Sequence, residues 1–175
     1  MNDLSLHILD ITQNSISAGA TEISISLLID GEMMTITIED NGKGMTHEVV
    51  AQLSDPFFTS RTTRKVGLGI PLLIDSAEQS GGKVSVSSEV GVGTKVVATF
   101  DTSNIDCPPL GNIANAVVLL ASSNPNIEFI FDYLSVEGDS YIFDTREVKK
   151  ALGGISINTP TIIKYLEEMI AEQIF

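Results

Sequence analysis

The chain has 175 residues, of which 43% are hydrophobic and 19% are charged, an ordinary composition for a globular protein with one good core. Its formal net charge of −13 argues against nucleic acid or an anionic membrane as a partner, because binding to phosphate groups depends on Lys and Arg. The sequence contains one cysteine, no apolar run of about 18 residues and no signal-peptide pattern, so we expect a cytoplasmic protein without a membrane span.

Helical and strand patterns alternate along roughly the first hundred residues. Residues 3–18 predict a helix, and residues 22–40 predict two alternating strands joined by a tight turn. Short helices are expected over 46–53 and 69–80, followed by a second hairpin over 83–100. This order predicts an α+β fold in which helices cover one face of a sheet, a two-layer α/β sandwich.

A stretch that contains Pro and Gly then interrupts the pattern. We expect one domain over 1–104, a linker over 105–111 and a small C-terminal α/β extension over 112–175. The extension should contain a helix, two strands and two final helices, and its content of Ile, Phe and Leu indicates that it folds. The sequence assigns it no role.

The segment IEDNGKGM, residues 38–45, contains the first candidate site. Asn41-Gly42 is a strong hairpin signal, yet the residues that follow do not resemble a returning strand. Asp40 shares the strand parity of the isoleucines before it, so its carboxylate should face the buried side, where it needs a donor. Gly42 and Gly44 allow close approach of the backbone, and these features together suit a flat heterocycle that offers an amino group.

Thr94, near the start of a later strand, shares parity with Val96 and Ala98 and should also face inward. Asp40 and Thr94 can therefore meet the same edge of a ligand. The alternative for each residue alone is an ordinary turn aspartate or an ordinary strand threonine.

The first predicted helix carries a polar stripe, whose members are spaced by three and four residues: His7, Asp10, Asn14 and Ser17. An Asn oxygen beside a carboxylate suits a Mg²⁺ ion that also binds phosphate oxygens, or the positioning of a water molecule. The stripe can equally be the solvent-facing side of an amphipathic helix.

The segment Gly67-Leu68-Gly69 leads directly into a predicted helix, and such a junction favours anions through its free N–H groups and the helix dipole. Four basic residues lie close to the glycine motifs, and they indicate either a local anion site or a solvated loop: Lys43, Arg61, Arg64 and Lys65. The segment is neither a Walker A loop nor a Rossmann fingerprint.

Four motifs occur in one order: an Asp-Ile-Thr-Gln-Asn segment, DNGKGM, DPFFTSR followed by GLGI, and GVGT. With these motifs, residues 4–100 resemble the nucleotide-binding domain shared by histidine kinases, DNA gyrase B, Hsp90 and MutL, the GHKL ATPases. The resemblance implies a layered sandwich, the histidine kinase-like ATPase fold, that holds Mg-ATP between helices and sheet.

The resemblance also implies roles for single residues. Asn14 would hold Mg²⁺, and Asp40 would bond to the adenine amino group with help from Thr94. Asp10 would act as general base, and Asn41-Gly42 would shape the nucleotide pocket instead of a hairpin. The implied nucleotide-binding set is Asn14, Asp40, Gly42, Gly44, Met45, Arg61, Gly67, Leu68, Gly69 and Thr94.

The chain departs from the family pattern at several positions. Asp10 stands where family ATPases usually carry Glu, so we expect hydrolysis that is slow or needs a partner. No basic residue lies near Ser17, and the segment between Arg61 and Gly67 is short, which implies a small ATP lid. His7 is not in a phosphoacceptor sequence, so we expect no phosphoacceptor-histidine domain and no self-phosphorylation by that route.

These observations predict a Mg-ATP-binding regulatory protein with weak ATPase activity, or with Ser/Thr protein-kinase activity toward a protein partner, as in anti-sigma-factor kinases. The alternative is a non-catalytic module whose protein interactions depend on bound nucleotide. A clamp that dimerises on ATP is a third hypothesis, so a homodimer stays open. A narrower resemblance, to stand-alone bacterial ATP-binding regulators associated with iron-only hydrogenase systems, rests on LSLHILDI, DPFFTSR and FDTREVKKALGG.

Overall fold

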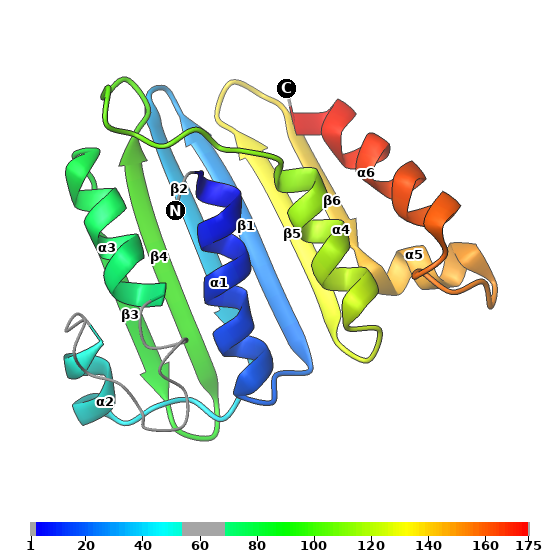
Figure 1. Cartoon of the computed structure of the whole chain (residues 1–175), viewed down its shortest axis with the longest axis horizontal. Helices are drawn as coiled ribbons and strands as arrows, with labels where there is room; N and C mark the ends of the chain where they lie inside the picture. The colour runs from blue at the N-terminus through cyan, green and yellow to red at the C-terminus, as the bar shows by residue number, and fades with distance from the viewer. Residues whose placement is uncertain (1–2, 54–68, 175) are drawn as a thin grey trace.

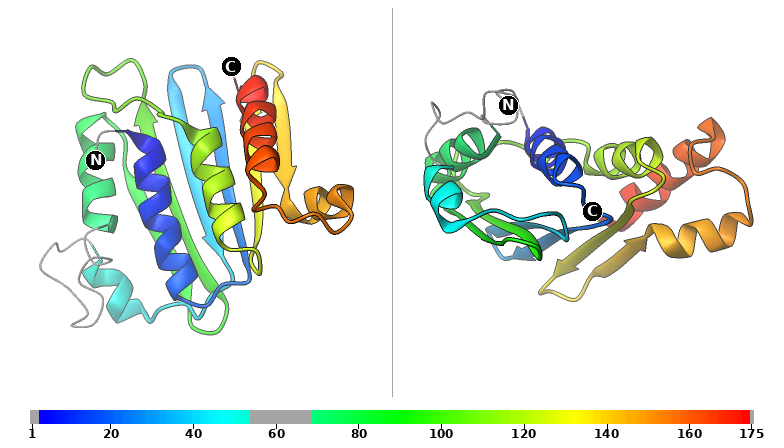
Figure 2. Two further views of the ribbon diagram at one scale, coloured as in Figure 1. Left: turned by 45° about the vertical axis from the view of Figure 1, so that its right-hand side comes forward. Right: turned by 90° about the horizontal axis from the view of Figure 1, so that it is seen from below.

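The computed structural model describes residues 3–53 and 69–174, which form a mixed sheet with helices packed against one face (Figures 1 and 2). The strands lie in the order β3-β4-β2-β1-β5-β6. They are β1 (Glu22–Asp30), β2 (Met33–Asp40), β3 (Val84–Glu89), β4 (Gly93–Asp101), β5 (Glu128–Ser135) and β6 (Ser140–Asp144). The helices are α1 (Leu4–Ser17), α2 (His47–Gln52), α3 (Gly69–Gln79), α4 (Ile113–Ser123), α5 (Thr145–Leu152) and α6 (Pro160–Ile174). The α+β sandwich predicted from the sequence is confirmed.

The hairpin of β1 and β2 forms the centre of the sheet. Its register places Ile25 opposite Ile38 and Leu27 opposite Ile36, and all four side chains are buried under the helices. Because side chains alternate along a strand, the intervening residues point to the other face and are serine, threonine or charged at most positions. The alternation therefore decides which face of the hairpin receives the helix layer.

The helix layer has α1 at its middle, with α3 on one side and α4 on the other (Figure 1). Leu4, Ile8 and Ile11 of α1 recur at helical spacing and are at most 2% exposed. The N–H groups of Leu4 and Ser5, at the start of α1, each donate a hydrogen bond of 2.9 Å to a backbone carbonyl in the segment that precedes α4. These two bonds tie that segment to α1. Within the described residues, no helix is both long and apolar enough to cross a membrane.

The C-terminal extension adds its two strands to the same sheet. β5 runs parallel to β1 and places Phe131 opposite Ile25, and β6 pairs antiparallel with β5. The helices α4 and α6 pack on each other and share one apolar core with the N-terminal part. The domain boundary at 105–111 stays a prediction, although the described residues on both sides of it belong to one sheet and one core.

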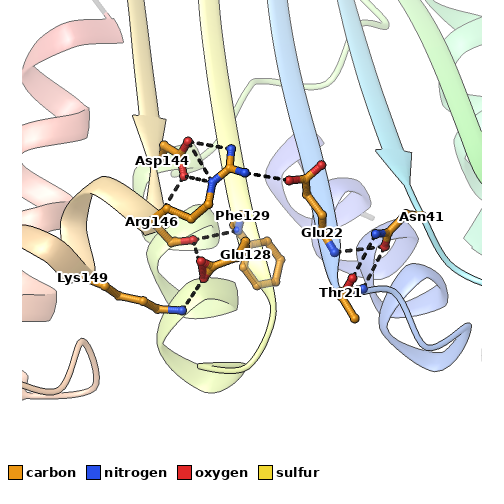
Figure 3. A network of polar contacts seen from close by, with 9 residues as sticks. Thr21, Glu22, Asn41, Glu128, Phe129, Asp144, Arg146 and Lys149 are labelled. Carbon is orange, nitrogen blue, oxygen red and sulfur yellow. Dashed lines mark hydrogen bonds and ion pairs between the residues drawn. The ribbon is translucent and has the colours of Figure 1, made fainter.

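Polar contacts add a second connection between the extension and the rest of the sheet (Figure 3). The Arg146 guanidinium of α5 donates to Asp144 Oδ2 at 2.9 Å and to Glu22 Oε1 of β1 at 3.1 Å. Lys149 forms an ion pair with Glu128 at the start of β5, so this contact lies within the extension itself. Arg146 and Glu22 are both about half-exposed, so these contacts add less to stability than the apolar core does.

Candidate functional site

The candidate site lies where β2 ends, β4 begins and the C-terminal half of α1 faces the start of α3 (Figure 1). The pairing of β2 with β4 places Asp40 directly opposite Thr94. Both residues lie at the same end of the sheet and, as the strand parity predicted, on the same face. The residues of the four sequence motifs that the structure describes therefore gather in one region.

Asp40 is held by two donors on the helix side of the sheet. The Ser15 hydroxyl of α1 donates to Asp40 Oδ2 at 2.6 Å, and the Gly42 N–H donates to Asp40 Oδ1 at 2.8 Å. No donor for Asp40 was predicted from the sequence, and Ser15 was missed. The available signal was its spacing from Ile8 and Ile11, because a serine on the buried side of an amphipathic helix needs a polar partner.

Thr94 is paired with a second serine, which was not predicted from the sequence either. Ser88 Oγ lies 2.8 Å from Thr94 Oγ1, and it accepts a hydrogen bond from the Met45 N–H at 2.8 Å. The available signal was strand parity, because Ser88 alternates with Val86 on one side of its strand, and the structure places it opposite Thr94. Ser88 thus joins the hairpin to the segment that follows Asp40.

The two glycines of that segment are required by close backbone approach. A Cβ on Gly42 would lie 2.8 Å from the Ala18 Cβ and 3.0 Å from Asp40 Oδ1. Gly44 has a φ of +72°, and a Cβ there would lie 2.0 Å from the Glu89 carbonyl oxygen. A side chain at position 42 would press on Ala18 and the Asp40 carboxyl, and one at position 44 would overlap the Glu89 carbonyl.

Asn41 explains why the Asn-Gly signal does not form a hairpin. Its side-chain oxygen accepts hydrogen bonds from the N–H groups of Thr21 and Glu22 at 2.8 and 3.0 Å, and its amide donates to Thr21 Oγ1 at 2.9 Å (Figure 3). These contacts anchor the end of β2 to the start of β1. The backbone after Gly42 is then free to lead toward α2.

The polar stripe of α1 faces α3 at its N-terminal end. His7 is 2% exposed, and its Nε2 lies 2.9 Å from Ser76 Oγ of α3. Burial lowers the pKa of His7 to about 4, so the ring is neutral at pH 7. The solvent-facing alternative is therefore wrong for His7, while Ser17, at the other end of the stripe, is exposed.

Asp10 and Asn14 lie next along this stripe, toward the start of α3. A Cβ on Gly69 would lie 2.6 Å from Asp10 Oδ2, so the carboxylate lies against the first residue of α3. Burial raises the pKa of Asp10, which makes it a stronger base than an exposed aspartate. Asn14 Oδ1 is buried and lacks a hydrogen-bond partner in the described parts of the chain.

The orphaned oxygen of Asn14 fits a Mg²⁺ ion, which prefers oxygen ligands and takes several of them from phosphate and water. Within residues 3–53 and 69–174, no group of three or more His, Cys, Asp or Glu side chains could hold a metal by itself. A Mg²⁺ ion here would thus depend on Asn14 together with a phosphorylated ligand.

Three of the predicted site residues, Arg61, Gly67 and Leu68, lie outside the described residues. Met45 is half-buried and enters the site through its backbone N–H. Lys43 of the basic cluster is exposed, and its carbonyl accepts from the Gly91 N–H at 2.7 Å.

A hollow of about 490 Å³ lies near the same strand ends, lined among others by Ser24, Glu39, Ser87 and Lys95. These four side chains have the parity of the uncovered face, opposite to Ile25, Ile38 and Val96. The hollow is also lined by Asp40, Ser88 and Thr94, so it reaches the candidate site, and we assign the site to the helix side because Asp10 and Asn14 of α1 lie there.

Comparison with known families identifies a match that covers the candidate site. Residues 2–104 match the model of the histidine kinase-, DNA gyrase B-, and HSP90-like ATPase family. A sensor kinase CckA of Brucella abortus is 32% identical over 84 residues, which are 47% of this chain and 9% of that protein. Sporulation kinase E of Bacillus subtilis is 32% identical over 97 residues, which are 53% of this chain and 13% of that protein. The chain thus spans a small part of the length of these kinases.

Solved structures share the fold at low sequence identity. The N-terminal domain of a DNA repair protein superposes with a TM-score of 0.59 and 18% identity, covering 81% of this chain and 52% of that one. The MutL ATPase domain of Aquifex aeolicus, solved with ADP, superposes with a TM-score of 0.50 and 18% identity, covering 82% and 63%. The resemblance to hydrogenase-associated regulators stays a prediction.

Proposed function

Because the chain belongs to the histidine kinase-, DNA gyrase B-, and HSP90-like ATPase family, we propose that it binds Mg-ATP at this site and acts as a regulatory protein. Bound ATP would be hydrolysed slowly, or its γ-phosphate would pass to a Ser or Thr of a partner protein. The observation that carries the proposal is the facing pair of Asp40 and Thr94, with Asp10 and Asn14 on the adjacent helix.

The geometry supports a division of labour among these residues. Asp40, already fixed by Ser15 and Gly42, would accept a hydrogen bond from the adenine amino group. Asn14 would hold Mg²⁺, which offsets the negative charge of the phosphates. Asp10 would accept the proton of the attacking water or hydroxyl, and its raised pKa suits a general base.

A non-catalytic module that changes its protein contacts with bound nucleotide is the second candidate. The observation that favours it is the short side chain of Asp10, which lies against Gly69 and reaches one methylene less than a glutamate. In either case the expected partner is a protein, and the net charge of −13 opposes nucleic acid and anionic membranes. A cytoplasmic location and the ATP-dependent homodimer of a clamp are likewise proposals.

The test follows the label of γ-labelled ATP after incubation with Mg²⁺, with the purified protein alone and with host lysate added. Label on a host protein would show a kinase, and label released as phosphate would show an ATPase. Label that stays on ATP, with binding confirmed by calorimetry, would favour the non-catalytic module. Sedimentation with and without ATP tests for the clamp.

Two aspartate variants connect the result to the site. Asp40→Asn should abolish most binding, because an obligatory acceptor becomes a group that also donates. Asp10→Asn should keep binding and lower turnover by about 10²–10⁴-fold, the usual contribution of a general base. Asp30→Asn, at the exposed far end of the same hairpin, is the matched control. Wild-type affinity in Asp40→Asn would exclude this pocket.

A further inference from the structure

The Ser88 hydroxyl makes three polar contacts, and only one orientation of its proton satisfies all of them. Its Oγ lies near three groups: the Met45 N–H at 2.8 Å, the Gly93 carbonyl at 3.0 Å and Thr94 Oγ1 at 2.8 Å. A hydroxyl has one proton to donate and two lone pairs with which to accept. The orientations of the two hydroxyl protons follow from this inventory.

The Met45 N–H can only donate and the Gly93 carbonyl can only accept. Ser88 therefore uses one lone pair for Met45 and its single proton for Gly93. The contact with Thr94 is then satisfied only if Thr94 donates its proton to the remaining lone pair of Ser88. The opposite orientation would leave the Gly93 carbonyl without this donor.

This arrangement leaves Thr94 with lone pairs and no proton for a ligand. The Asp40 carboxyl, directly opposite, accepts from Ser15 at one oxygen and from Gly42 at the other, so both of its oxygens act as acceptors. The Asp40 and Thr94 side chains at this end of the β2–β4 pair thus present acceptors to a ligand. A purine with a 6-amino group can donate to them, directly or through a water, whereas a 6-oxo group would place oxygen against oxygen.

We propose that Ser88 is a specificity-determining residue, which selects 6-aminopurine over 6-oxopurine nucleotides by accepting the hydrogen bond that the Thr94 hydroxyl donates. The proposal rests on the function proposed above and adds to it a positioning residue that does not itself touch the nucleotide. Without the Ser88 acceptor, Thr94 can turn its proton toward a 6-oxo group, so discrimination should fall.

The test measures the ratio of the dissociation constants of IDP and ADP by calorimetry in the presence of Mg²⁺. These two nucleotides differ in the 6-substituent and the N1 proton, and diphosphates avoid turnover. The wild type should prefer ADP by about 5–150-fold, since a buried acceptor left without a donor costs roughly 1–3 kcal/mol. Ser88→Ala should reduce the ratio by about 5–10-fold, the value of one hydrogen bond.

Matched variants separate proton orientation from structure. Ser87→Ala changes the exposed neighbour on the other face of β3 and should leave the ratio unchanged. Ser88→Thr keeps the hydroxyl and suits a strand, so it should keep the ratio. If Ser88→Ala does not fold, judged by circular dichroism, Ser88→Cys retains the volume with a weak acceptor and should reduce the ratio in the same direction.

The outcomes distinguish this proposal from the one on which it rests. A wild-type ratio that survives in a folded Ser88→Ala or Ser88→Cys protein overturns the role of Ser88 and leaves ATP binding intact. Equal loss of ADP and IDP affinity would also overturn it, because that pattern shows a purely structural serine. A wild-type protein that binds no ADP refutes the proposed function itself.

Discussion

Single atoms decide much of the chemistry at the α1–α3 junction. Gly69 opens α3, and its missing side chain leaves room for the Asp10 carboxylate, which would otherwise lie 2.6 Å from a Cβ. The φ of Gly69 is not in the left-handed region, so an alanine there meets no backbone strain. The one group that must move is the end of a flexible side chain.

Gly69→Ala should therefore displace Asp10 without removing its charge. We expect ATP turnover to fall by about 10–100-fold, since misplacing a catalytic group by an ångström costs rates of this order. Thermal stability should change little, because alanine is the better helix former. Leu72→Ala, at an exposed position on the same helix, is the control, and unchanged turnover in Gly69→Ala would show that Asp10 is not the base.

The raised pKa of Asp10 gives an independent check at the residue scale. Burial favours the neutral carboxyl, so the base should lose activity by protonation at a higher pH than an exposed aspartate would. Turnover measured as pH falls should show this acid limb. Asp10→Glu should restore the longer reach of the glutamate that the family usually carries, and it should move the pH of the acid limb, because a different carboxyl then titrates. An acid limb at the same pH in both proteins would belong to another group.

At the scale of elements, the packing of α1 on α3 buries a histidine that must stay neutral. His7 contacts Ser76 across 69 positions of sequence and has a pKa lowered by burial from 6.5 to about 4. Between these values the unfolded chain binds a proton that the folded chain does not. The free energy of unfolding therefore falls as the pH is lowered from 6.5 toward 4.

His7→Gln should remove this part of the pH dependence. The wild type should lose more stability than the variant between pH 7 and pH 5, and urea unfolding at both values measures the difference. Asp10, whose pKa shift has the opposite effect, is present in both proteins and cancels in the comparison. His47→Gln, at an exposed position at the start of α2, is the control, and parallel pH profiles for wild type and His7→Gln would contradict the assignment.

The whole molecule depends on how the C-terminal extension joins the sheet. Phe131 of β5 is fully buried opposite Ile25 of β1, while the ion pair of Arg146 with Glu22 is about half-exposed. Burial of apolar surface is the larger contribution, because an exposed ion pair gains little over its hydration. The extension should thus be held mainly by its aromatic side chains.

A pair of substitutions measures this difference. Phe131→Ala should lower the free energy of unfolding by about 3–5 kcal/mol, the usual cost of a large cavity. Arg146→Gln should lower it by less than about 1 kcal/mol. Chemical denaturation gives both values, and a larger effect for Arg146→Gln would mean that the polar network in Figure 3 holds the extension.

The sequence by itself determined the features that depend on neighbouring residues. Strand alternation predicted that Asp40 and Thr94 face the same side, helical spacing predicted α1 and its polar stripe, and the glycines of DNGKGM predicted a close approach that Gly42 and Gly44 make. The order of the motifs indicated the family. Such signals are local, so they can be interpreted without knowing the fold.

Only the tertiary structure decided which surfaces meet. It assigned Ser15 as the donor to Asp40, Ser88 as the partner of Thr94 and Met45, and His7 as a buried residue of the α1–α3 contact. It also joined β5 to β1 in parallel, so that the extension completes the sheet. Periodicity tells which side of an element is buried, but it contains no information about the distant segment that covers that side. That choice depends on how well the assembled surfaces pack and satisfy each other's polar groups.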